Sequence, residues 1–378
     1  MKERKNFIFG LMLVFSLLNF KGPLNLENYL EKLAPRVVIG YYPYWKQKEF
    51  DCQKINYKYL THIAHAFTKP DKEGNLIVTA NYLYPELNRT AHENGVKVLA
   101  SVGGWGNCED FPAMVATEVT RSRFIGQVLD FCLENEYDGV DIDWEFVSNP
   151  AEQENFIFFI KELSLTLKTQ SPPLLLTMAS PSQPYWGRWI NYEELTSDFD
   201  YIAFMTYGYH GQWSDHSGHN SPLFSCNNDE CGSVNDSFLY ATLRQIPAEK
   251  LLLGVPFFGC SFDCDDLYQE FKVSNYYGYS DLRKFIDSGW TYVWDACAKV
   301  PFIRKPDHSE VISFEDEWSI SLKCQYFREK KVAGVIIWEL SQDAFQNSSP
   351  LLQVIGREFK NRHCPKEKEQ EKKIKDYK

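Results

Sequence analysis

Three carboxylates share one face of a short, strand-like segment near the middle of the chain. The segment DGVDIDWEF spans residues 138–146 and alternates acidic with apolar side chains. Because side chains two apart on a strand face the same way, Asp141, Asp143 and Glu145 form one acidic row. A buried carboxylate is costly unless it is paired or neutralised, and no Lys, Arg or His lies in this segment. The row therefore predicts carboxyl groups that share protons.

Two structural interpretations of the acidic row are less suitable than a catalytic one. A calcium site would need a loop with a turn glycine and more oxygen ligands, and a solvated charged face would not fit a central strand. Close carboxyls push one another's pKa values apart, so that some stay protonated near neutral pH. A carboxylic acid held neutral can act as a general acid, which cleavage of a glycosidic bond requires.

Eight short apolar runs would position this row. They span residues 36–42, 61–67, 96–104, 139–145, 174–179, 201–207, 250–258 and 333–340. Their nearly continuous hydrophobicity is typical of parallel strands covered on both faces, and helical patterns lie between several of them, such as 122–136 and 152–170. The alternation predicts an α/β fold, a (β/α)8 TIM barrel. A doubly wound sheet is the alternative, but the GxGxxG motif expected after its first strand is absent from the sequence.

The intervals between the predicted strands define the domains. The last interval, from Phe258 to Ala333, is longer than one helix and its loops require. We therefore expect residues 260–312 to form a small α+β insertion between strands 7 and 8 of a catalytic barrel that spans 35–362. Residues 363–378 are rich in charge and nearly free of apolar side chains, which predicts a disordered tail.

The amino terminus has the pattern of a signal peptide. A basic start precedes an apolar run from Phe7 to Leu18, which is too short to span a bilayer comfortably. We expect residues 1–22 to be a signal peptide, with an uncleaved anchor as the alternative because the cleavage site is poor. Three glycosylation sequons are compatible with secretion, and they lie at Asn88, Asn235 and Asn347. The prediction is a secreted, extracellular protein.

Cysteine content and net charge limit the partners. Ten cysteines fit an oxidising compartment, and Cys226/Cys231 and Cys260/Cys264 are close enough for local bridges, with free buried thiols as the alternative. No CxxC pair occurs, so neither zinc nor another metal or cofactor is expected. The net charge of −11 argues against nucleic acid and anionic membranes as partners. No membrane partner is expected once the signal peptide is removed, and the protein is expected to be a monomer.

Motifs along the chain resemble those of the family 18 glycoside hydrolases, the chitinase family. DGVDIDWE (138–145) is similar to the family's DxxDxDxE signature, and SVGGWG (101–106) is similar to its SxGG element. FMTYGYHGQWS (204–214), LLLGVPFFG (251–259) and GVIIWEL (334–340) resemble its motifs on strands six, seven and eight. The resemblance runs in order from about Val37 to Arg362.

The resemblance implies a substrate-assisted mechanism, in which the N-acetyl carbonyl of the sugar attacks its own anomeric carbon. Glu145 would be the general acid and then the base. Asp143 would orient the acetamide, and Asp141 would share a proton with Asp143. Tyr207 would donate a hydrogen bond to the acetamide oxygen, and Trp338 would form the floor under the reacting sugar.

The family resemblance also implies which residues bind substrate. The aromatic side chains that match sugar-stacking positions are Tyr41, Trp45, Trp105 and Trp213, and Gly104 and Met205 complete the predicted set. Gly103 and Gly104 are also expected to permit a tight backbone approach. Four positions depart from the family pattern, and they are Phe146, Gly208, Phe258 and Cys260. These changes remove polar groups and leave the acid in place, which predicts an enzyme with altered pH dependence or subsite preference.

Three functions are therefore considered. The first is a secreted, endo-acting chitinase that hydrolyses β-1,4-linked N-acetylglucosamine polymers with retention, through an oxazolinium ion. The second is a chitinase-like lectin that binds chitin oligosaccharides with little or no cleavage, which the presence of Glu145 disfavours. The third is an endo-β-N-acetylglucosaminidase that acts on N-glycans. The predicted insertion and the tryptophans favour a long polymer, so the expected partner is chitin or its oligosaccharides.

Overall fold

A computed structural model describes residues 36–345 and 348–360 of the 378-residue chain. The predictions of a signal peptide over 1–22 and of a disordered tail over 363–378, and the sequon at Asn347, lie outside the described residues. Within the described part of the chain, no helix combines the length and the hydrophobicity that crossing a membrane requires.

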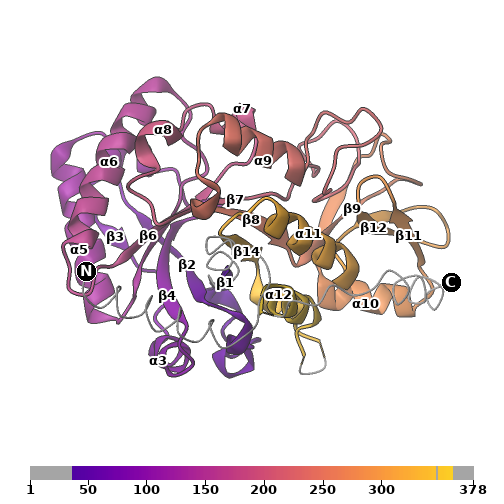
Figure 1. The fold of residues 1–378 in the computed structure, drawn as a ribbon, viewed down its shortest axis with the longest axis horizontal. Helices are drawn as coiled ribbons and strands as arrows, with labels where there is room; N and C mark the ends of the chain where they lie inside the picture. The colour runs from indigo at the N-terminus through magenta and orange to yellow at the C-terminus, as the bar shows by residue number, and fades with distance from the viewer. Residues whose placement is uncertain (1–35, 346–347, 361–378) are drawn as a thin grey trace, which may run out of the picture. The chain divides into compact units, whose positions relative to one another are not determined.

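Eight parallel strands close into a barrel (Figure 1). They are β1 (Val37–Pro43), β2 (His62–Pro70), β4 (Lys97–Gly103), β5 (Gly139–Asp143), β6 (Leu175–Ser180), β7 (Tyr201–Phe204), β8 (Leu251–Pro256) and β14 (Gly334–Trp338). Strand β1 pairs with both β14 and β2, so the first and last strands, indigo and yellow in Figure 1, lie side by side and close the sheet. The short strand β3 (Leu76–Ile77) adds an antiparallel extension to β2. The predicted TIM barrel is confirmed, and each predicted run overlaps a different barrel strand.

Alternation along the strands separates two apolar layers. Residues such as Ile39, Leu99 and Leu252 point into the barrel and form a small inner cluster. The residues between them, such as Val98 and Leu253, belong to a much larger core beneath the surrounding helices. Strands covered on both faces therefore read as continuous apolar runs in the sequence.

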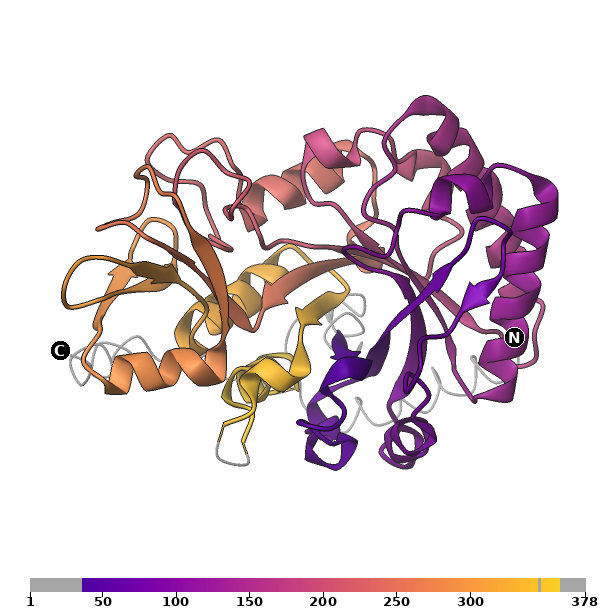
Figure 2. The same cartoon turned by 180° about the vertical axis from the view of Figure 1, so that it is seen from behind.

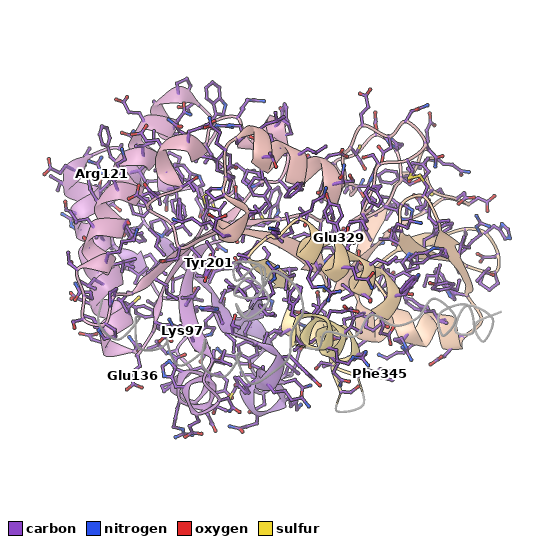
Figure 3. All side chains as sticks on the ribbon, viewed as in Figure 1. Lys97, Arg121, Glu136, Tyr201, Glu329 and Phe345 are labelled. Atoms are coloured by element: carbon purple, nitrogen blue, oxygen red, sulfur yellow. A yellow bond between two sulfur atoms is a disulfide. The ribbon has the colours of Figure 1, made fainter. Side chains whose placement is uncertain are left out.

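Helices surround the barrel. In chain order they are α3 (Pro85–Glu93), α4 (Phe111–Val115), α5 (Glu118–Glu134), α6 (Pro150–Lys168), α7 (Pro184–Gly187), α8 (Tyr192–Leu195), α9 (Val234–Leu243), α11 (Glu317–Glu329) and α12 (Pro350–Lys360). Helix α6 begins at an Asn149 cap whose side chain accepts the Glu152 N–H, with Pro150 in its first turn. Arg121 on α5 is labelled in Figure 3. It binds Glu162 on α6 at 2.8 Å and ties together the two helices beside β5.

A second sheet lies between β8 and β14 in chain order. Its antiparallel strands have the order β10-β9-β13-β12-β11 and are β9 (Phe258–Phe262), β10 (Ser274–Gly278), β11 (Thr291–Asp295), β12 (Val300–Arg304) and β13 (Val311–Ser313). Helix α10 (Tyr279–Asp287) belongs to the same segment. In Figure 2 this orange segment lies on the side of the barrel away from the magenta helices α5 and α6.

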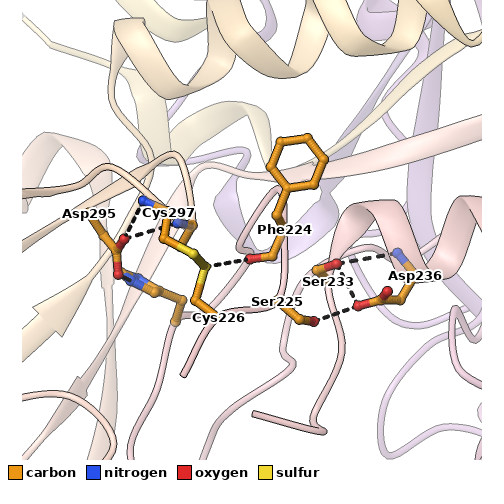
Figure 4. Close-up of a disulfide and its surroundings, with 9 residues drawn as sticks. Phe224, Ser225, Cys226, Ser233, Asp236, Asp295 and Cys297 are labelled. Atoms are coloured by element: carbon orange, nitrogen blue, oxygen red, sulfur yellow. Dashed lines mark hydrogen bonds and ion pairs between the residues drawn. A yellow bond between two sulfur atoms is a disulfide. The ribbon is translucent and has the colours of Figure 1, made fainter. Parts of the chain in front are cut away.

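The predicted local disulfides are wrong. Cys226 is bonded to Cys297, 71 residues away in the sequence (Figure 4). Cys231 is therefore a free thiol, and Cys260 and Cys264 are free and buried in the small core of the second sheet. The pairing was missed because spacing along the chain carries no information about which loops the tertiary structure brings together.

Candidate active site

The acidic row lies at the carboxyl end of β5. Asp141 and Asp143 point into the barrel, and both side chains are buried. Val140 and Ile142 lie in the core beneath the helices, where Trp144 stacks on Phe111 with ring centroids 5.0 Å apart. The alternation predicted from the sequence therefore places the apolar residues under helices and the acids inside the barrel.

Asp141 is held by hydroxyl groups from three other strands. Its Oδ2 accepts hydrogen bonds from Tyr41 and Ser101, both at 2.7 Å, and its Oδ1 accepts one from Thr177 at 2.6 Å. Ser101 and Thr177 flank Asp141 in the strand register, which places their hydroxyls in the same layer. Burial raises the pKa of Asp141, and the three hydrogen bonds act against that rise.

Asp143 lacks such donors. Its Oδ1 is buried and has no hydrogen-bond partner within the described residues. Burial raises the pKa of Asp143 well above its ordinary value, and the charges of Glu145 and Asp141 raise it further. A buried carboxylate with an unmatched oxygen is costly, so this group holds a proton or awaits a donor from outside the protein.

Glu145 follows the strand and is partly exposed. Burial raises its pKa to about 7, and a hydrogen bond from the backbone of Trp105 opposes the rise. Its own N–H donates to the Cys108 sulfur at 3.2 Å. None of the groups that shift the pKa values of Asp141, Asp143 and Glu145 is a cation. Glu145 therefore keeps its proton near neutral pH and can give it away there.

Two glycines bring β4 against the acidic row. Gly103 has a φ of +111°, and a Cβ there would lie 2.2 Å from the Asp143 carbonyl oxygen. Gly104 donates its N–H to the same carbonyl at 2.8 Å, and a Cβ at Gly104 would meet the Phe67 ring at 2.4 Å. The expectation of a tight backbone approach is confirmed at both positions. Their role is to let the chain after β5 lie close to β4.

Tyr207 reaches the acids from the loop after β7. The residue is partly exposed, and desolvation followed by the charges of Asp143 and Glu145 raises its pKa well above the ordinary value. Gly254 on β8 makes room for it, since a Cβ there would lie 2.7 Å from the Tyr207 ring. Met205, two residues earlier, packs against the inner apolar cluster of the barrel.

A chain of polar contacts fixes the loop that carries Tyr207. Ser221 donates a 2.6 Å hydrogen bond to the Thr206 carbonyl, and the buried Lys323 ammonium on α11 donates to the Ser221 hydroxyl at 2.7 Å. Asn220 accepts the Gly208 N–H at 3.0 Å and donates to the Phe258 carbonyl at 3.1 Å. These bonds fix the backbone on both sides of Tyr207.

Aromatic rings form one wall of the barrel mouth. Trp338 at the end of β14 lies 5.4 Å from the Tyr41 ring and stacks on Phe67 at 5.7 Å, with 12° between the ring planes. Trp45 lies 6.2 Å from Phe67. Sequence reasoning missed Phe67, although an aromatic residue at the end of a predicted strand was an available signal.

The remaining predicted substrate residues are exposed. Trp105 is 76% exposed, Trp213 61% and Trp45 47%, which leaves their ring faces free for a ligand. A second exposed pair, Tyr185 and Trp186, was not predicted, and Trp186 contacts Phe146 next to Glu145 at 5.2 Å. Large aromatic faces at a polar mouth suit carbohydrate rings, which present both apolar faces and hydroxyl edges.

The structure accounts for two of the unusual positions. Gly208 has a φ of +68°, and its N–H is used by Asn220. Cys260 lies on β9, fully buried in the core of the second sheet beside Ser274, 3.1 Å from its hydroxyl. Cys260 therefore does not reach the barrel mouth, so the change at this position does not alter a subsite there, contrary to the prediction made for the four departures together.

Comparisons with known proteins identify the family and the fold. The model of the family described as "Glycosyl hydrolases family 18" matches residues 37–343. "Probable chitinase 10" of Drosophila melanogaster is 26% identical over 367 residues, and the match covers 85% of this chain but 16% of the fly protein. The "chitinase-like effector" of Moniliophthora roreri is 26% identical over 400 residues, which are 88% of this chain and 94% of that protein. The Group IV chitinase of Ostrinia furnacalis, solved in complex with allosamidin, superposes with a TM-score of 0.80 at 27% identity, over 85% of this chain and 97% of that one.

Proposed function

Because this chain belongs to glycosyl hydrolases family 18, we propose that it is a chitinase that hydrolyses β-1,4 linkages between N-acetylglucosamine units. The observation that carries the proposal is Glu145, a carboxyl group with a pKa raised to about 7 at the mouth of the barrel. A general acid works best when its pKa lies near the working pH, because it is then both protonated and able to release its proton.

The proposed reaction proceeds with retention and with help from the substrate. Glu145 donates its proton to the glycosidic oxygen as the bond to the anomeric carbon breaks. The acetamide oxygen of the same sugar attacks that carbon, and an oxazolinium ion forms. Glu145, now a carboxylate, then removes a proton from water, which opens the ring with the original configuration.

Asp143 is proposed to hold the acetamide during this step. Its unpartnered, buried Oδ1 supports the proposal, because an acetamide N–H is the kind of donor that this oxygen lacks. A hydrogen bond to Asp143 would also stabilise the positive charge of the oxazolinium ion. Both oxygens of Asp141 accept hydrogen bonds from hydroxyl groups. That Asp141 also shares a proton with Asp143 stays a prediction.

Tyr207 and Trp338 are proposed to complete the subsite. The high pKa of Tyr207 keeps its hydroxyl protonated, so that it can donate to the acetamide oxygen and aim it at the anomeric carbon. The Trp338 ring would lie beneath the sugar. The exposed rings of Trp45, Trp105 and Trp213 would stack further units, which supports an endo-acting enzyme on a long polymer.

We also propose that the protein is secreted. The Cys226–Cys297 disulfide supports an oxidising compartment. Expression of the full chain in a eukaryotic secretory host, followed by a search for the protein in the medium, tests this. Retention of all the protein inside the cells would contradict it.

Hydrolysis of a fluorogenic chitotriose analogue tests the catalytic proposal. The wild type, Glu145→Gln and Glu134→Gln are compared, and Glu134 is an exposed residue of α5 that makes the same substitution a control. We expect turnover by the wild type and the control, and a loss of at least about 10²-fold in Glu145→Gln, the range for removal of a general acid.

Two outcomes would overturn the proposal. Binding of chitin oligosaccharides without turnover by the wild type would make the protein a lectin. Turnover of a high-mannose glycoprotein in preference to chitotriose would make it an endo-β-N-acetylglucosaminidase.

A further inference from the structure

The long loop between β7 and α9, residues 205–233, brings together four side chains that the catalytic proposal does not use. They are His210, His216, Asp229 and Cys231, and one nitrogen, oxygen or sulfur atom from each lies within 4.8 Å of all the others. His210 is fully buried and Asp229 almost so, while His216 and Cys231 lie at the edge. The cluster is therefore reachable from solvent on one side.

The spacing of the two imidazole nitrogens and the Asp229 oxygens is close to the edges of a tetrahedron around zinc. His210 Nε2 and His216 Nε2 lie 3.3 Å apart, and each lies 3.4 Å from an oxygen of Asp229. Ligand distances of about 2.0–2.1 Å for His nitrogen and carboxylate oxygen give tetrahedral edges of roughly 3.3–3.4 Å. Two imidazole nitrogens at this distance share either a proton, in a hydrogen bond, or a metal cation, because two facing lone pairs would repel each other.

The outer nitrogens of both imidazoles are engaged by acceptors. His210 Nδ1 lies 3.0 Å from the His219 carbonyl, and His216 Nδ1 bonds to the Asp215 carboxylate. An acceptor at Nδ1 fixes the proton there and turns the Nε2 lone pair toward the cluster centre. Outer partners of this kind, a carbonyl or a carboxylate, accompany most metal-binding histidines.

Asp229 and Cys231 are also positioned and available to bind a metal ion. Asp229 Oδ1 accepts the Cys231 N–H at 3.0 Å, which fixes the turn between them. Cys231 is free to act as a ligand because Cys226 is already bonded to Cys297.

We propose that His210, His216, Asp229 and Cys231 bind one Zn²⁺ ion as a structural site. Two imidazoles, one carboxylate and one thiolate form a four-coordinate set that leaves no position for water or substrate, which distinguishes it from a catalytic zinc site. Binding releases the thiol proton to solvent. The site goes beyond the proposed hydrolase function, and it does not depend on that function.

The ion would join the two ends of the loop. His210 and His216 lie on either side of the exposed Trp213, whereas Asp229 and Cys231 lie just before α9. The Cys226–Cys297 bond ties the same part of the loop to the second sheet. Zinc would thus hold in place the turn that presents Trp213.

The test is metal binding by the full chain, measured without any sugar. Metal-free protein is titrated with Zn²⁺ by calorimetry, and Co²⁺ is added to a second sample for absorption spectroscopy. We expect one Zn²⁺ per chain, a higher melting temperature with Zn²⁺, and a sulfur-to-cobalt charge-transfer band. The spectrum is recorded on the wild type, so it stands even where a variant fails to fold.

Matched variants locate the site. Cys231→Ala is paired with Cys132→Ala, a thiol on α5, and His216→Ala is paired with His308→Ala, an exposed histidine outside the cluster. We expect the first of each pair to lose Zn²⁺ binding and the second to keep it. Asp215→Asn, which alters the partner of His216, should weaken binding about 10–100-fold.

Two results would overturn the proposal. In the first, the wild type binds no Zn²⁺ and its melting temperature does not change. In the second, Cys231→Ala binds Zn²⁺ as tightly as the wild type and gives the same cobalt spectrum, which would place the ion elsewhere. Loss of chitotriose hydrolysis in Glu145→Gln has no bearing on either result.

Discussion

Two groups of buried carboxylates in this protein have opposite surroundings. The acids of the row, Asp143 above all, have no cation beside them. Burial raises the pKa of each, and like charges raise that of Asp143 further. Glu315, just before α11, is as deeply buried but forms an ion pair with the Lys323 ammonium. Burial raises the pKa of Glu315 too, and there the ammonium acts against the rise.

The difference shows how the partner decides the role of a buried acid. Glu315 and Lys323 compensate each other and hold Ser221, so the pair serves to fix the loop that carries Tyr207. Asp143 and Glu145 keep an uncompensated desolvation cost, which the fold tolerates because a proton or a substrate can relieve it. Asp141 is intermediate, since neutral hydroxyls take the place of a cation.

Breaking the buried ion pair should produce the largest effect. Lys323→Met leaves the Glu315 carboxylate buried without a cation, with only the Ser319 hydroxyl as a partner. We expect the free energy of unfolding to fall by about 3–5 kcal/mol. Chemical denaturation measures this. Lys161→Met, which removes an exposed partner of Glu194, is the control and should change stability by less than about 1 kcal/mol.

The double variant Glu315→Leu/Lys323→Met sharpens that prediction. Replacing both charges with apolar side chains should recover most of the loss, because no charge is left without a partner. A double variant as unstable as Lys323→Met would show that the hydrogen bonds to Ser221, and not the charges, carry the stability.

The acids of β5 should instead control the pH dependence of activity. The protonated form of Glu145 is the active form in the free enzyme, so kcat/KM should be flat below a pH of about 7 and fall about tenfold per unit above it. Chitotriose hydrolysis between pH 5 and 9 measures the profile, and the residual rate of Glu145→Gln should lack this decline. A wild-type profile that stays level to pH 9 would contradict the assignment of the acid.

Removing one of the hydroxyl groups that donate to Asp141 tests how strongly these hydrogen bonds stabilise the protein. Tyr41→Phe takes away one of three donors and should cost about 1–2 kcal/mol of unfolding free energy, the value of a hydrogen bond to a charged or partly charged group. Tyr185→Phe, at an exposed ring, is the control and should leave the stability unchanged. No loss in Tyr41→Phe would mean that Ser101 and Thr177 satisfy Asp141 by themselves.

The smallest effect is expected from Asp143→Asn, and it should be stabilising. The pKa of Asp143 is higher in the folded than in the unfolded state. The wild type therefore loses stability as the pH rises from the unfolded-state pKa, about 3.9, to the folded-state pKa. Asparagine has no such proton to lose. The melting temperature of the variant minus that of the wild type should therefore increase between pH 4 and pH 8. The variant should hydrolyse chitotriose more slowly than the wild type.

Calorimetry at several pH values checks this prediction, with Asp130→Asn on the outer face of α5 as the control. If the melting temperature of Asp143→Asn instead falls relative to that of the wild type as the pH rises, Asp143 is ionised and favourably held in the folded protein.

The barrel and the acidic row could be predicted from the sequence because both rest on local periodicity. Eight apolar runs correspond to eight barrel strands, since a strand covered on both faces must be apolar at nearly every position. The alternation around Ile142 fixed which side of β5 carries the acids. Gly103 and Gly104 could be recognised as well, because a close backbone approach requires glycine at the position itself.

Contacts between distant segments could not be predicted in this way. The sequence suggested bonds between near neighbours, but Cys226 pairs with Cys297, because a disulfide requires two Cα atoms within about 7 Å and not two nearby numbers. Zinc was discounted for want of a CxxC pair. The proposed ligands, two histidines, an aspartate and a cysteine spread over residues 210–231, make no familiar spacing and meet only because the loop folds back on itself.

The acidic row shows the same division between local pattern and tertiary contact. The sequence by itself determined that Asp141, Asp143 and Glu145 face one way, because a strand turns alternate residues to the same side. Only the tertiary structure decided that Asp141 meets three hydroxyls while one oxygen of Asp143 meets none. Those partners come from β1, β4 and β6, and their arrival at one point depends on strand register and barrel closure, which no local pattern specifies.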